Sequence, residues 1–302
     1  MKAEIPEALA GERIDRVVAM LTGLPRSQVA ELVGAGAVRL AGGVVSTRST
    51  RVRGGDRVEV DVAAAEAEPA PPVLEVDLAV VHADDDVIVV DKAPGVVVHP
   101  GAGNAGGTLA QALLARYPEL AGVGQAQRGG VVHRLDKGTS GLLVVARSPR
   151  AYESLVAQLG SRLVERRYLA LVWGCPRPPR GLVDAPIGRS RRDPTRMTVS
   201  GTGREARTAY EVQRAFGQPV EVALVGCRLE TGRTHQIRVH LSAIGHPVVG
   251  DARYRGRRAD LACPRPFLHA ERLDFDHPGT GERLSFSSPL PPDLSEVLSA
   301  LA

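Results

Sequence analysis

The stretch HRLDKGTSGLLVVAR, residues 133–147, is the most informative part of this chain and the starting point for its fold. It places a carboxylate, Asp136, between the cations Arg134 and Lys137, and a turn of small residues then leads into an apolar run over 141–146. Such a run after a turn predicts a short buried strand, which can hold one side chain rigidly at a cleft. The neighbouring positive charges favour the ionised form of Asp136, and a fixed carboxylate can act as a nucleophile or a base. The alternative is a surface turn with a local salt bridge.

The sequence around this stretch predicts mainly strands with a few helices. Strands are expected over residues 79–82, 87–91, 167–173, 207–214, 220–229, 268–275 and 283–287. Helices are expected over residues 108–116, 148–159, 234–243 and 294–301. Because strands and helices do not alternate regularly, the pattern favours an α+β fold over a doubly wound one. We expect a mixed, mainly antiparallel sheet.

The first 62 residues predict a small, separate α/β unit. Helices are expected over 13–21 and 28–33, a hairpin over 38–45 and a strand over 57–62. Residues 63–75 are rich in proline and alanine, which is typical of a semi-extended linker. The predicted organisation is therefore a domain over 1–62, a linker over 63–75 and a larger domain over 76–302.

The composition is that of an ordinary soluble protein, with 302 residues, of which 43% are hydrophobic and 24% charged. No apolar run approaches the roughly 18 residues of a membrane span. The first 20 residues carry several charges and no apolar core, so we expect no signal peptide and a place in the cytoplasm. The three cysteines are isolated, which argues against a disulfide framework or a zinc site.

The charge distribution predicts an anionic partner. The sequence pI is about 9.2, and residues 147–214 hold 14 arginines against 6 acidic residues, a net charge of +8. The densest basic run covers 188–196, where Arg189, Arg191 and Arg192 are candidate contacts to RNA or DNA. A solvated face, and an arginine bias from a GC-rich genome, are the plain alternatives.

Two further segments carry candidate chemistry. In VVDKAPGVVVHP, residues 89–100, two strands meet at a Pro-Gly turn, and a buried Lys92 would need a carboxylate or carbonyl partner. The other segment is LETGRTHQIRVHL at residues 229–241, followed by GHPVVGD at 245–251. His235 and His240 are five residues apart, off the four-residue spacing of a helical zinc pair, so we expect no metal here.

Taken together, the three segments resemble the pseudouridine synthases of the RluA/RluD type over about residues 76–290. The HRLD run and the GRTHQIR run are highly specific when they occur jointly. Residues 1–62 resemble the small αL-type RNA-binding module first seen in a small-subunit ribosomal protein. One departure is visible, because Ala93 separates Lys92 from Pro94 where the family usually has Lys-Pro.

The resemblance implies an RNA-modifying isomerase of the bacterial cytoplasm that needs neither cofactor nor metal. Such enzymes convert uridine to pseudouridine by breaking the bond from nitrogen, rotating the base and forming a carbon–carbon bond. The implied partner is structured RNA, most of all large-subunit ribosomal RNA, and the implied state is a monomer.

The resemblance also assigns roles to four residues. Asp136 matches the catalytic aspartate, and Arg238 matches the basic residue that pairs with it. Tyr168 matches a tyrosine that stacks on the detached uracil, and Arg134 matches an arginine that takes the place of the everted base. Whether Asp136 attacks the sugar, adds to the ring or removes a sugar proton stays open. The alternatives are a surface helix residue for Arg238, a core tyrosine for Tyr168 and a local salt-bridge partner for Arg134.

In the small module, four arginines are candidate phosphate contacts, namely Arg13, Arg16, Arg26 and Arg39. With 9 basic and 8 acidic residues, the module has a net charge of only +1, which favours a role in orientation over raw affinity. Four other functions remain open for the whole chain: a non-catalytic RNA-binding or ribosome assembly factor, a base-removing glycosidase, a structural tRNA-binding protein, and a pseudouridine synthase that acts on tRNA.

Overall fold

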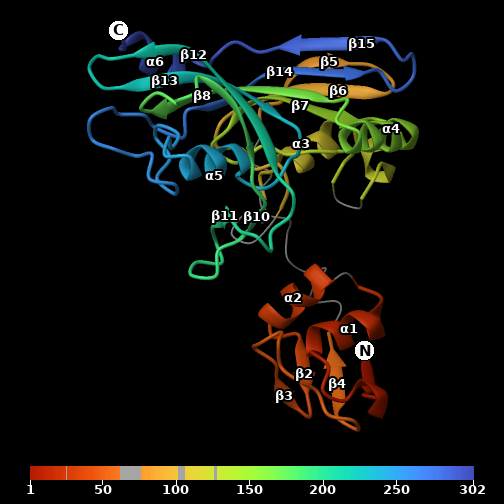
Figure 1. Cartoon of the computed structure of the whole chain (residues 1–302). Coiled ribbons are helices and arrows are strands. Elements are labelled where there is room, and N and C mark those ends of the chain that lie inside the picture. Colours follow the sequence, from red (N-terminus) through yellow and green to blue (C-terminus); the bar gives the residue numbers. More distant parts are fainter. Residues whose placement is uncertain (25, 62–75, 101–105, 126–127) are drawn as a thin grey trace. The chain divides into compact units, whose positions relative to one another are not determined.

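A computed structural model describes residues 1–24, 26–61, 76–100, 106–125 and 128–302. The chain divides into two compact units, Met1–Pro72 and Val73–Ala302 (Figure 1). The expected linker over 63–75 lies outside the described residues.

The N-terminal unit combines two helices with a small antiparallel sheet. Its helices are α1 (Ile14–Thr22) and α2 (Arg26–Gly34), and its strands are β1 (Lys2–Glu4), β2 (Val38–Leu40), β3 (Gly43–Val44) and β4 (Arg57–Val60). The strand order is β1-β4-β2-β3. Both expected helices, the hairpin and the last strand are confirmed, whereas β1 was not predicted.

The unit's core comes from the apolar face of each helix. Ile14, Val17 and Val18 of α1 are fully buried, as are Val29 of α2 and Val58 of β4. The spacing of the α1 residues puts them on one side of the helix, as the sequence pattern indicated.

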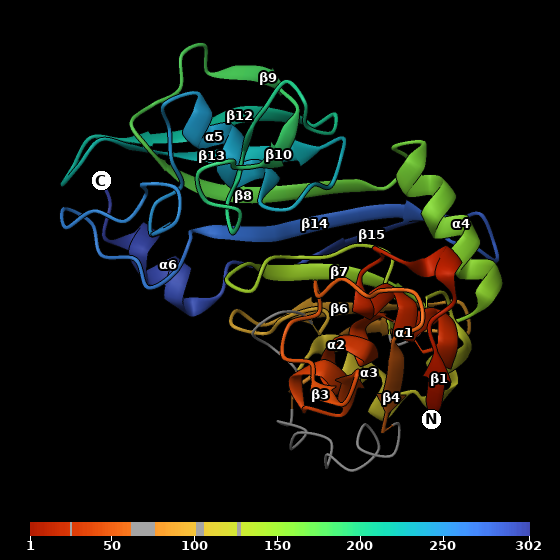
Figure 2. The same cartoon turned by 90° about the horizontal axis from the view of Figure 1, so that it is seen from below.

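The larger unit is built on a nine-stranded mixed sheet. Its strands are β5 (Ala79–Ala83), β6 (Val87–Lys92), β7 (Ser140–Ala146), β8 (Glu165–Trp173), β9 (Arg180–Asp184), β12 (Arg207–Phe216), β13 (Val222–Leu229), β14 (Leu268–Asp276) and β15 (Arg283–Ser287). The order is β5-β6-β7-β14-β8-β13-β12-β9, with β15 also paired to β14. Figure 2 shows β6 to β9 beside one another in this order. Only β7 and β14 run parallel, so the expected mixed, mainly antiparallel sheet is confirmed.

Helices cover this sheet. They are α3 (Leu109–Arg116), α4 (Pro149–Gly160), α5 (Gln236–Ala243) and α6 (Pro292–Ser299). Figure 1 shows α3, α4 and α5 on the same face of the sheet. A separate hairpin consists of β10 (Ile187–Arg189) and β11 (Met197–Val199). No helix in the part of the chain that the structure describes is long and apolar enough to cross a membrane.

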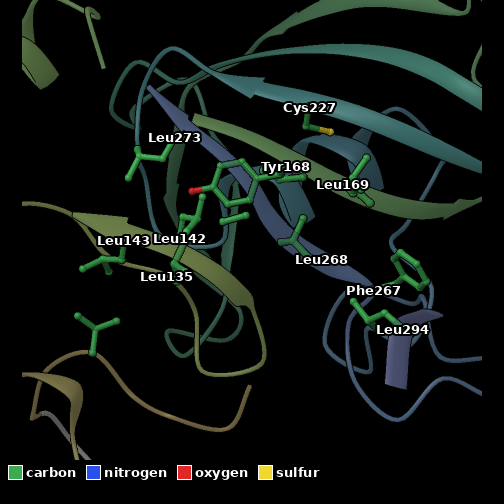
Figure 3. Packing of buried hydrophobic residues seen from close by; sticks show 14 of the residues in the cluster. Leu135, Leu142, Leu143, Tyr168, Leu169, Cys227, Phe267, Leu268, Leu273 and Leu294 are labelled. Atoms are coloured by element: carbon green, nitrogen blue, oxygen red, sulfur yellow. The ribbon is translucent and has the colours of Figure 1, made fainter. Parts of the chain in front are cut away.

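Strand β7 forms the centre of the core, as the apolar run over 141–146 predicted. All seven of its residues are buried, and Leu142 and Leu143 join a cluster with Leu135 and Leu268 (Figure 3). Gly141 has φ +112, and a Cβ on it would come within 2.3 Å of the Ala270 oxygen. This glycine therefore allows β7 to approach β14 closely.

Several elements begin or end up to two residues away from the expected boundaries. Helix α5 begins at Gln236 instead of residue 234, because His235 adopts a left-handed conformation with φ +58. Helix α6 covers 292–299 instead of 294–301, with Pro292 in its first turn, where a missing N–H costs no hydrogen bond. Strands β9, β10 and β11 were not predicted, because their short sequences carry no clear alternation.

Candidate active site

The loop that carries Asp136 is held by backbone contacts from several segments. The amide of Gly95 donates to the Lys137 oxygen (2.7 Å), and Arg265 Nη1 donates to the Gly138 oxygen (2.9 Å). Lys92, which is 2% exposed, donates through Nζ to two carbonyls of the Pro94–Gly95 turn, at Ala93 (2.8 Å) and Val96 (3.0 Å). The expected carbonyl partner for Lys92 is thus confirmed. These contacts fix the backbone next to Asp136.

Asp136 is paired with a guanidinium from a distant segment. Arg238 Nη1 donates to Asp136 Oδ2 at 3.0 Å, and the two side chains are 10% and 16% exposed. The charge in contact with Asp136 is therefore that of Arg238, 102 residues along the chain, and not that of its neighbour Arg134. Among the described residues Arg134 forms no ion pair, so the local salt bridge considered above is not seen.

Arg238 is itself held by a second carboxylate. Its Nε and Nη2 donate to Asp251 Oδ2 (2.6 Å) and Oδ1 (2.9 Å), and Asp251 is completely buried. Burial alone would lower the pKa of Arg238, but the hydrogen bonds and charges of Asp251 and Asp136 raise it above its ordinary value. The guanidinium is therefore a permanent cation in a fixed plane between two carboxylates.

His235 lies on the other side of Asp136. Its Nε2 is 4.0 Å from Asp136 Oδ1, and its Nδ1 is 2.9 Å from the Tyr254 hydroxyl. The Met197 amide donates to the Tyr254 hydroxyl, so that hydroxyl is free to donate its own proton to His235 Nδ1. The proton of the neutral histidine is then on Nε2, which faces Asp136. Burial lowers the pKa of His235, which favours this neutral form.

Tyr168 provides a flat, protonated side chain beside the carboxylate. It lies on β8 in the buried cluster shown in Figure 3 and is 5% exposed. Burial raises the pKa of Tyr168 to about 12, opposed by the charge of Arg166 and assisted by that of Asp136. The phenol therefore keeps its proton at neutral pH.

Four of the residues singled out in the sequence line one small cavity of about 40 Å³, namely Arg134, Asp136, Tyr168 and Arg238. Leu229, Ile237 and Leu268 supply its apolar wall. Asp136 is the one carboxylate that lines it among the described residues. The structure thus brings the four side chains together, and their chemical roles stay predictions.

A larger polar cavity of about 740 Å³ shares Arg134, Asp136 and Tyr168 with the small one. Its charged lining consists of Arg128, Arg134, Arg162, Arg166, Arg204 and Arg233 against Asp136, Glu205 and Glu230. Six cations against three anions leave a net positive charge. Such a cavity attracts a polyanion to the carboxylate at its edge.

The other predicted arginines are elsewhere. Arg189, Arg191 and Arg192 are exposed at the β10–β11 hairpin and line neither cavity. In the N-terminal unit, Arg13 pairs with Asp15 and Arg16 with Glu12, while Arg39 is exposed. The side chain of Arg26 lies outside the described residues.

Several residues of the site have roles that their local sequence does not indicate. Asp251 stood at the end of a quoted segment, but nothing local linked it to Arg238. His235 was weighed only as a metal ligand. Gln236 accepts from the Thr231 hydroxyl (2.7 Å) and the Arg233 amide (3.0 Å), so it shapes the turn before α5.

Comparison with known proteins places this geometry in a family. A model described as RNA pseudouridylate synthase matches residues 86–243, and an S4 domain model matches residues 12–58. A protein of Xanthomonas campestris named ribosomal large subunit pseudouridine synthase D is 44% identical over 99% of this chain and 92% of its own. A protein of the same name from Nitrosomonas europaea is 42% identical over 98% of this chain and 86% of its own.

A solved structure agrees with these relatives. Human RNA pseudouridylate synthase domain containing 1 is 30% identical, with a TM-score of 0.57 over 75% of this chain and 90% of its own. The matched segments include the Asp136 loop, β8 and α5, which supply most of the residues that line the small cavity. We conclude that this chain, an S4 domain followed by a catalytic domain, belongs to the RNA pseudouridylate synthase family and is an isomerase that acts on RNA.

Proposed function

We propose that this enzyme converts particular uridines of large-subunit ribosomal RNA to pseudouridine. Relatives named ribosomal large subunit pseudouridine synthase D, 40–44% identical over nearly the whole chain, support this choice of RNA. The observation that carries the proposed chemistry is the pairing of Asp136 with Arg238 in a partly buried cavity beside Tyr168.

In this proposal Asp136 is the catalytic residue. It reacts with the nucleotide while the base is detached, and the hydrogen bond from Arg238 holds the carboxylate in position. The base enters the cavity of about 40 Å³, whose apolar wall consists of Leu229, Ile237 and Leu268. Tyr168 stacks on the detached uracil there, with its hydroxyl protonated.

Arg134 assists entry of the nucleotide. A base inside a stacked helix cannot reach Asp136, so it must swing out at a cost of roughly a few kcal/mol. Arg134 is exposed at the edge of both cavities, and its planar guanidinium can stack in the vacated space.

The proposal includes the setting of the reaction. We place the activity in the cytoplasm, where ribosomal RNA is modified, and we take the active form to be a monomer. Size-exclusion chromatography of the active enzyme tests it, and activity confined to a dimer fraction would contradict it.

The decisive experiment maps pseudouridines in total RNA from cells that carry the intact enzyme, no enzyme, or the Asp136→Asn variant. We expect specific uridines of large-subunit ribosomal RNA to lose modification in the last two. The variant should retain RNA affinity within about threefold, because only the reacting oxygen is changed.

The same experiment separates the alternatives. Modification that persists both without the enzyme and with Asp136→Asn would indicate a non-catalytic RNA-binding factor, whereas modification lost only without the enzyme would show that Asp136 is not the catalytic residue. Pseudouridines that depend on the enzyme and occur only in tRNA would show that the substrate is tRNA and not ribosomal RNA. Abasic positions would indicate a glycosidase, whereas an isomerase leaves the mass of the RNA unchanged.

A further inference from the structure

Arg166 is a buried arginine next to the reaction site. It lies on β8 two residues before Tyr168, and side chains two apart on a strand point to the same face of the sheet. Arg166 is 6% exposed and lines the 740 Å³ cavity. A Cβ on Gly232 would lie 2.8 Å from Arg166 Nη1, so the guanidinium packs closely against the backbone of the turn before α5.

Arg166 has no partner for its charge among the described residues. It forms no ion pair and donates no hydrogen bond, and its Nε is completely buried without an acceptor. By contrast, the buried Arg238 and the partly buried Arg265 each hold a carboxylate in two hydrogen bonds. Burial lowers the pKa of Arg166 from its high ordinary value, and the cation in turn contributes to lowering the pKa of His133. A buried cation without a counter-charge is unfavourable unless a ligand completes it.

The position of Arg166 indicates which part of a nucleotide it meets. It lines the cavity of about 740 Å³ but not the small cavity that holds the pair of Asp136 and Arg238. A nucleotide whose base enters the small cavity leaves its sugar and phosphates in the large one. The planar guanidinium matches the oxygens of a phosphate with two parallel hydrogen bonds.

We propose that Arg166 binds one of the two phosphate groups that flank the isomerised uridine and thereby anchors the everted nucleotide beside Asp136. This rests on the proposed function. Arg166 is a binding residue in this reaction, and its missing partner is supplied by the RNA backbone.

The next residue offers a matched control. Arg167 points to the opposite face of β8, its side chain is 52% exposed, and it pairs with Glu165 at 3.1 Å. It lines neither cavity of the active site. The two substitutions Arg166→Met and Arg167→Met remove the same charge from the two faces of one strand.

The first measurement compares kcat/KM for pseudouridine formation on a synthetic RNA that spans a uridine mapped as described above. We expect Arg166→Met to lower kcat/KM by about 10- to 100-fold, the range for a lost charge-assisted hydrogen bond, and Arg166→Lys to lose less. Arg167→Met should stay within about twofold of the intact enzyme. Equal effects at positions 166 and 167 would contradict the proposal.

The second measurement locates the phosphate. A neutral methylphosphonate replaces the phosphate on the 5′ side of the uridine in one RNA and on the 3′ side in another. For the phosphate bound by Arg166, the replacement should slow the intact enzyme markedly but the Arg166→Met variant little, because the contact is already lost. A methylphosphonate that instead slows the Arg166→Met variant as strongly as the intact enzyme, on both the 5′ and the 3′ side, would overturn the phosphate assignment. That result would favour contact with the uracil oxygens.

The third measurement separates binding from a structural role. An arginine that stabilises the fold lowers the unfolding temperature when it is removed, whereas loss of an unpaired buried charge should leave it unchanged or raise it. A clearly lower unfolding temperature for Arg166→Met would refute the proposal. If the intact enzyme forms no pseudouridine on any mapped RNA, the proposed function fails, and the failure is not specific to Arg166.

Discussion

Asp251 shows how one residue outside the reaction site controls the geometry within it. Its two oxygens accept hydrogen bonds from Nε and Nη2 of Arg238. The remaining nitrogen, Nη1, therefore points at Asp136. The backbone amides of Arg253 and Tyr254 donate to Asp251 Oδ1 and hold it in turn (3.0 and 3.2 Å). The orientation of Arg238 is thus decided by a carboxylate that does not line the small cavity.

Substitution of Asp251 tests this dependence. Asp251→Asn keeps the shape but removes the charge, so we expect about 3 kcal/mol less free energy of unfolding, as for other broken buried pairs. Pseudouridine formation should fall by at least about tenfold, because Arg238 can rotate away from Asp136.

Urea unfolding and kcat/KM on mapped RNA measure the two effects. The control is Asp293→Asn, which weakens a similar pair with Arg265, but its carboxylate is 34% exposed. For Asp293→Asn we expect a smaller loss of unfolding free energy, about 1 kcal/mol. Equal losses of unfolding free energy in the two variants would contradict the importance of burial.

His133 determines how the fold responds to acid. Its Nε2 accepts a hydrogen bond from the Val144 amide of β7 at 3.1 Å, so the acceptor form is the neutral one. Burial, and then the charge of Arg166, lowers the pKa of His133 to about 3, whereas an unfolded histidine titrates near 6.5. The stability it contributes is therefore fully present above about pH 6.5 and is lost as the pH falls toward 3.

This predicts a pH-dependent difference between the intact enzyme and His133→Asn. Between pH 7 and 4.5 the intact enzyme should lose on the order of 2–3 kcal/mol more unfolding free energy than the variant, from the two pH units below the unfolded pKa. Urea unfolding at both pH values measures this. Parallel curves for the two proteins would show that another group accounts for the acid sensitivity.

At the scale of elements, the parallel pairing of β7 with β14 positions the Asp136 loop. His269 and Ala270 of β14 pair with Ser140 and Gly141 of β7, and the Ser140 hydroxyl is 3.0 Å from His269 Nδ1. Because β14 also pairs with β8, this register sets the Asp136 loop relative to the strand that carries Tyr168. One glycine makes the close approach possible.

Gly141→Ala should therefore be costly. At φ +112 a side chain is strained, and the added Cβ would collide with the Ala270 backbone at 2.3 Å. We expect a loss of about 2 kcal/mol or more in unfolding free energy and a lower rate of pseudouridine formation. Gly160→Ala is the control, because its Cβ would meet nothing within 4 Å. A Gly141→Ala protein as stable as this control would disprove the packing argument.

At the scale of the whole molecule, basic charge is spread over surfaces beyond the active site. The exposed arginines of the β10–β11 hairpin line neither cavity of the active site, so we expect them to contribute to RNA affinity and not to chemistry. The N-terminal unit matches an S4 domain over residues 12–58 but has a net charge of only +1 over residues 1–62. We propose that it orients the RNA more than it attracts it.

Removal of the charges on the β10–β11 hairpin tests whether its arginines contribute to RNA affinity. Replacing Arg189, Arg191 and Arg192 together with glutamine should weaken RNA binding and reduce the slope of log affinity against log salt by up to about 2 to 3. Titrations at several salt concentrations measure it. The control triple of Arg167, Arg272 and Arg283, each paired with a carboxylate, should change the slope less. An unchanged slope in the hairpin variant would rule out phosphate contacts there.

Local patterns predicted much of the fold and of the site. The buried strand β7, the helices α3 and α4, and the need of Lys92 for a carbonyl partner followed from residue types over a few positions. The predictions were weakest for the short strands β9, β10 and β11 and for the beginning of α5, where His235 leaves helical geometry. The spacing of apolar residues along the sequence cannot reveal a single residue with positive φ, and a three-residue strand is too short to show an alternating pattern.

By itself, the sequence determined the α+β class, the two units and the residues whose types suit the chemistry, because these depend on neighbours along the chain. Only the tertiary structure decided which side chains meet. The order β7-β14-β8 brings residues near positions 136, 168 and 238 to one cavity, and the loop after α5 supplies Asp251 as the second partner of Arg238. It also left Arg166 buried with no counter-charge from the residues that the structure describes. Ion pairs and burial depend on distances between segments far apart in the sequence, and no local pattern records those distances.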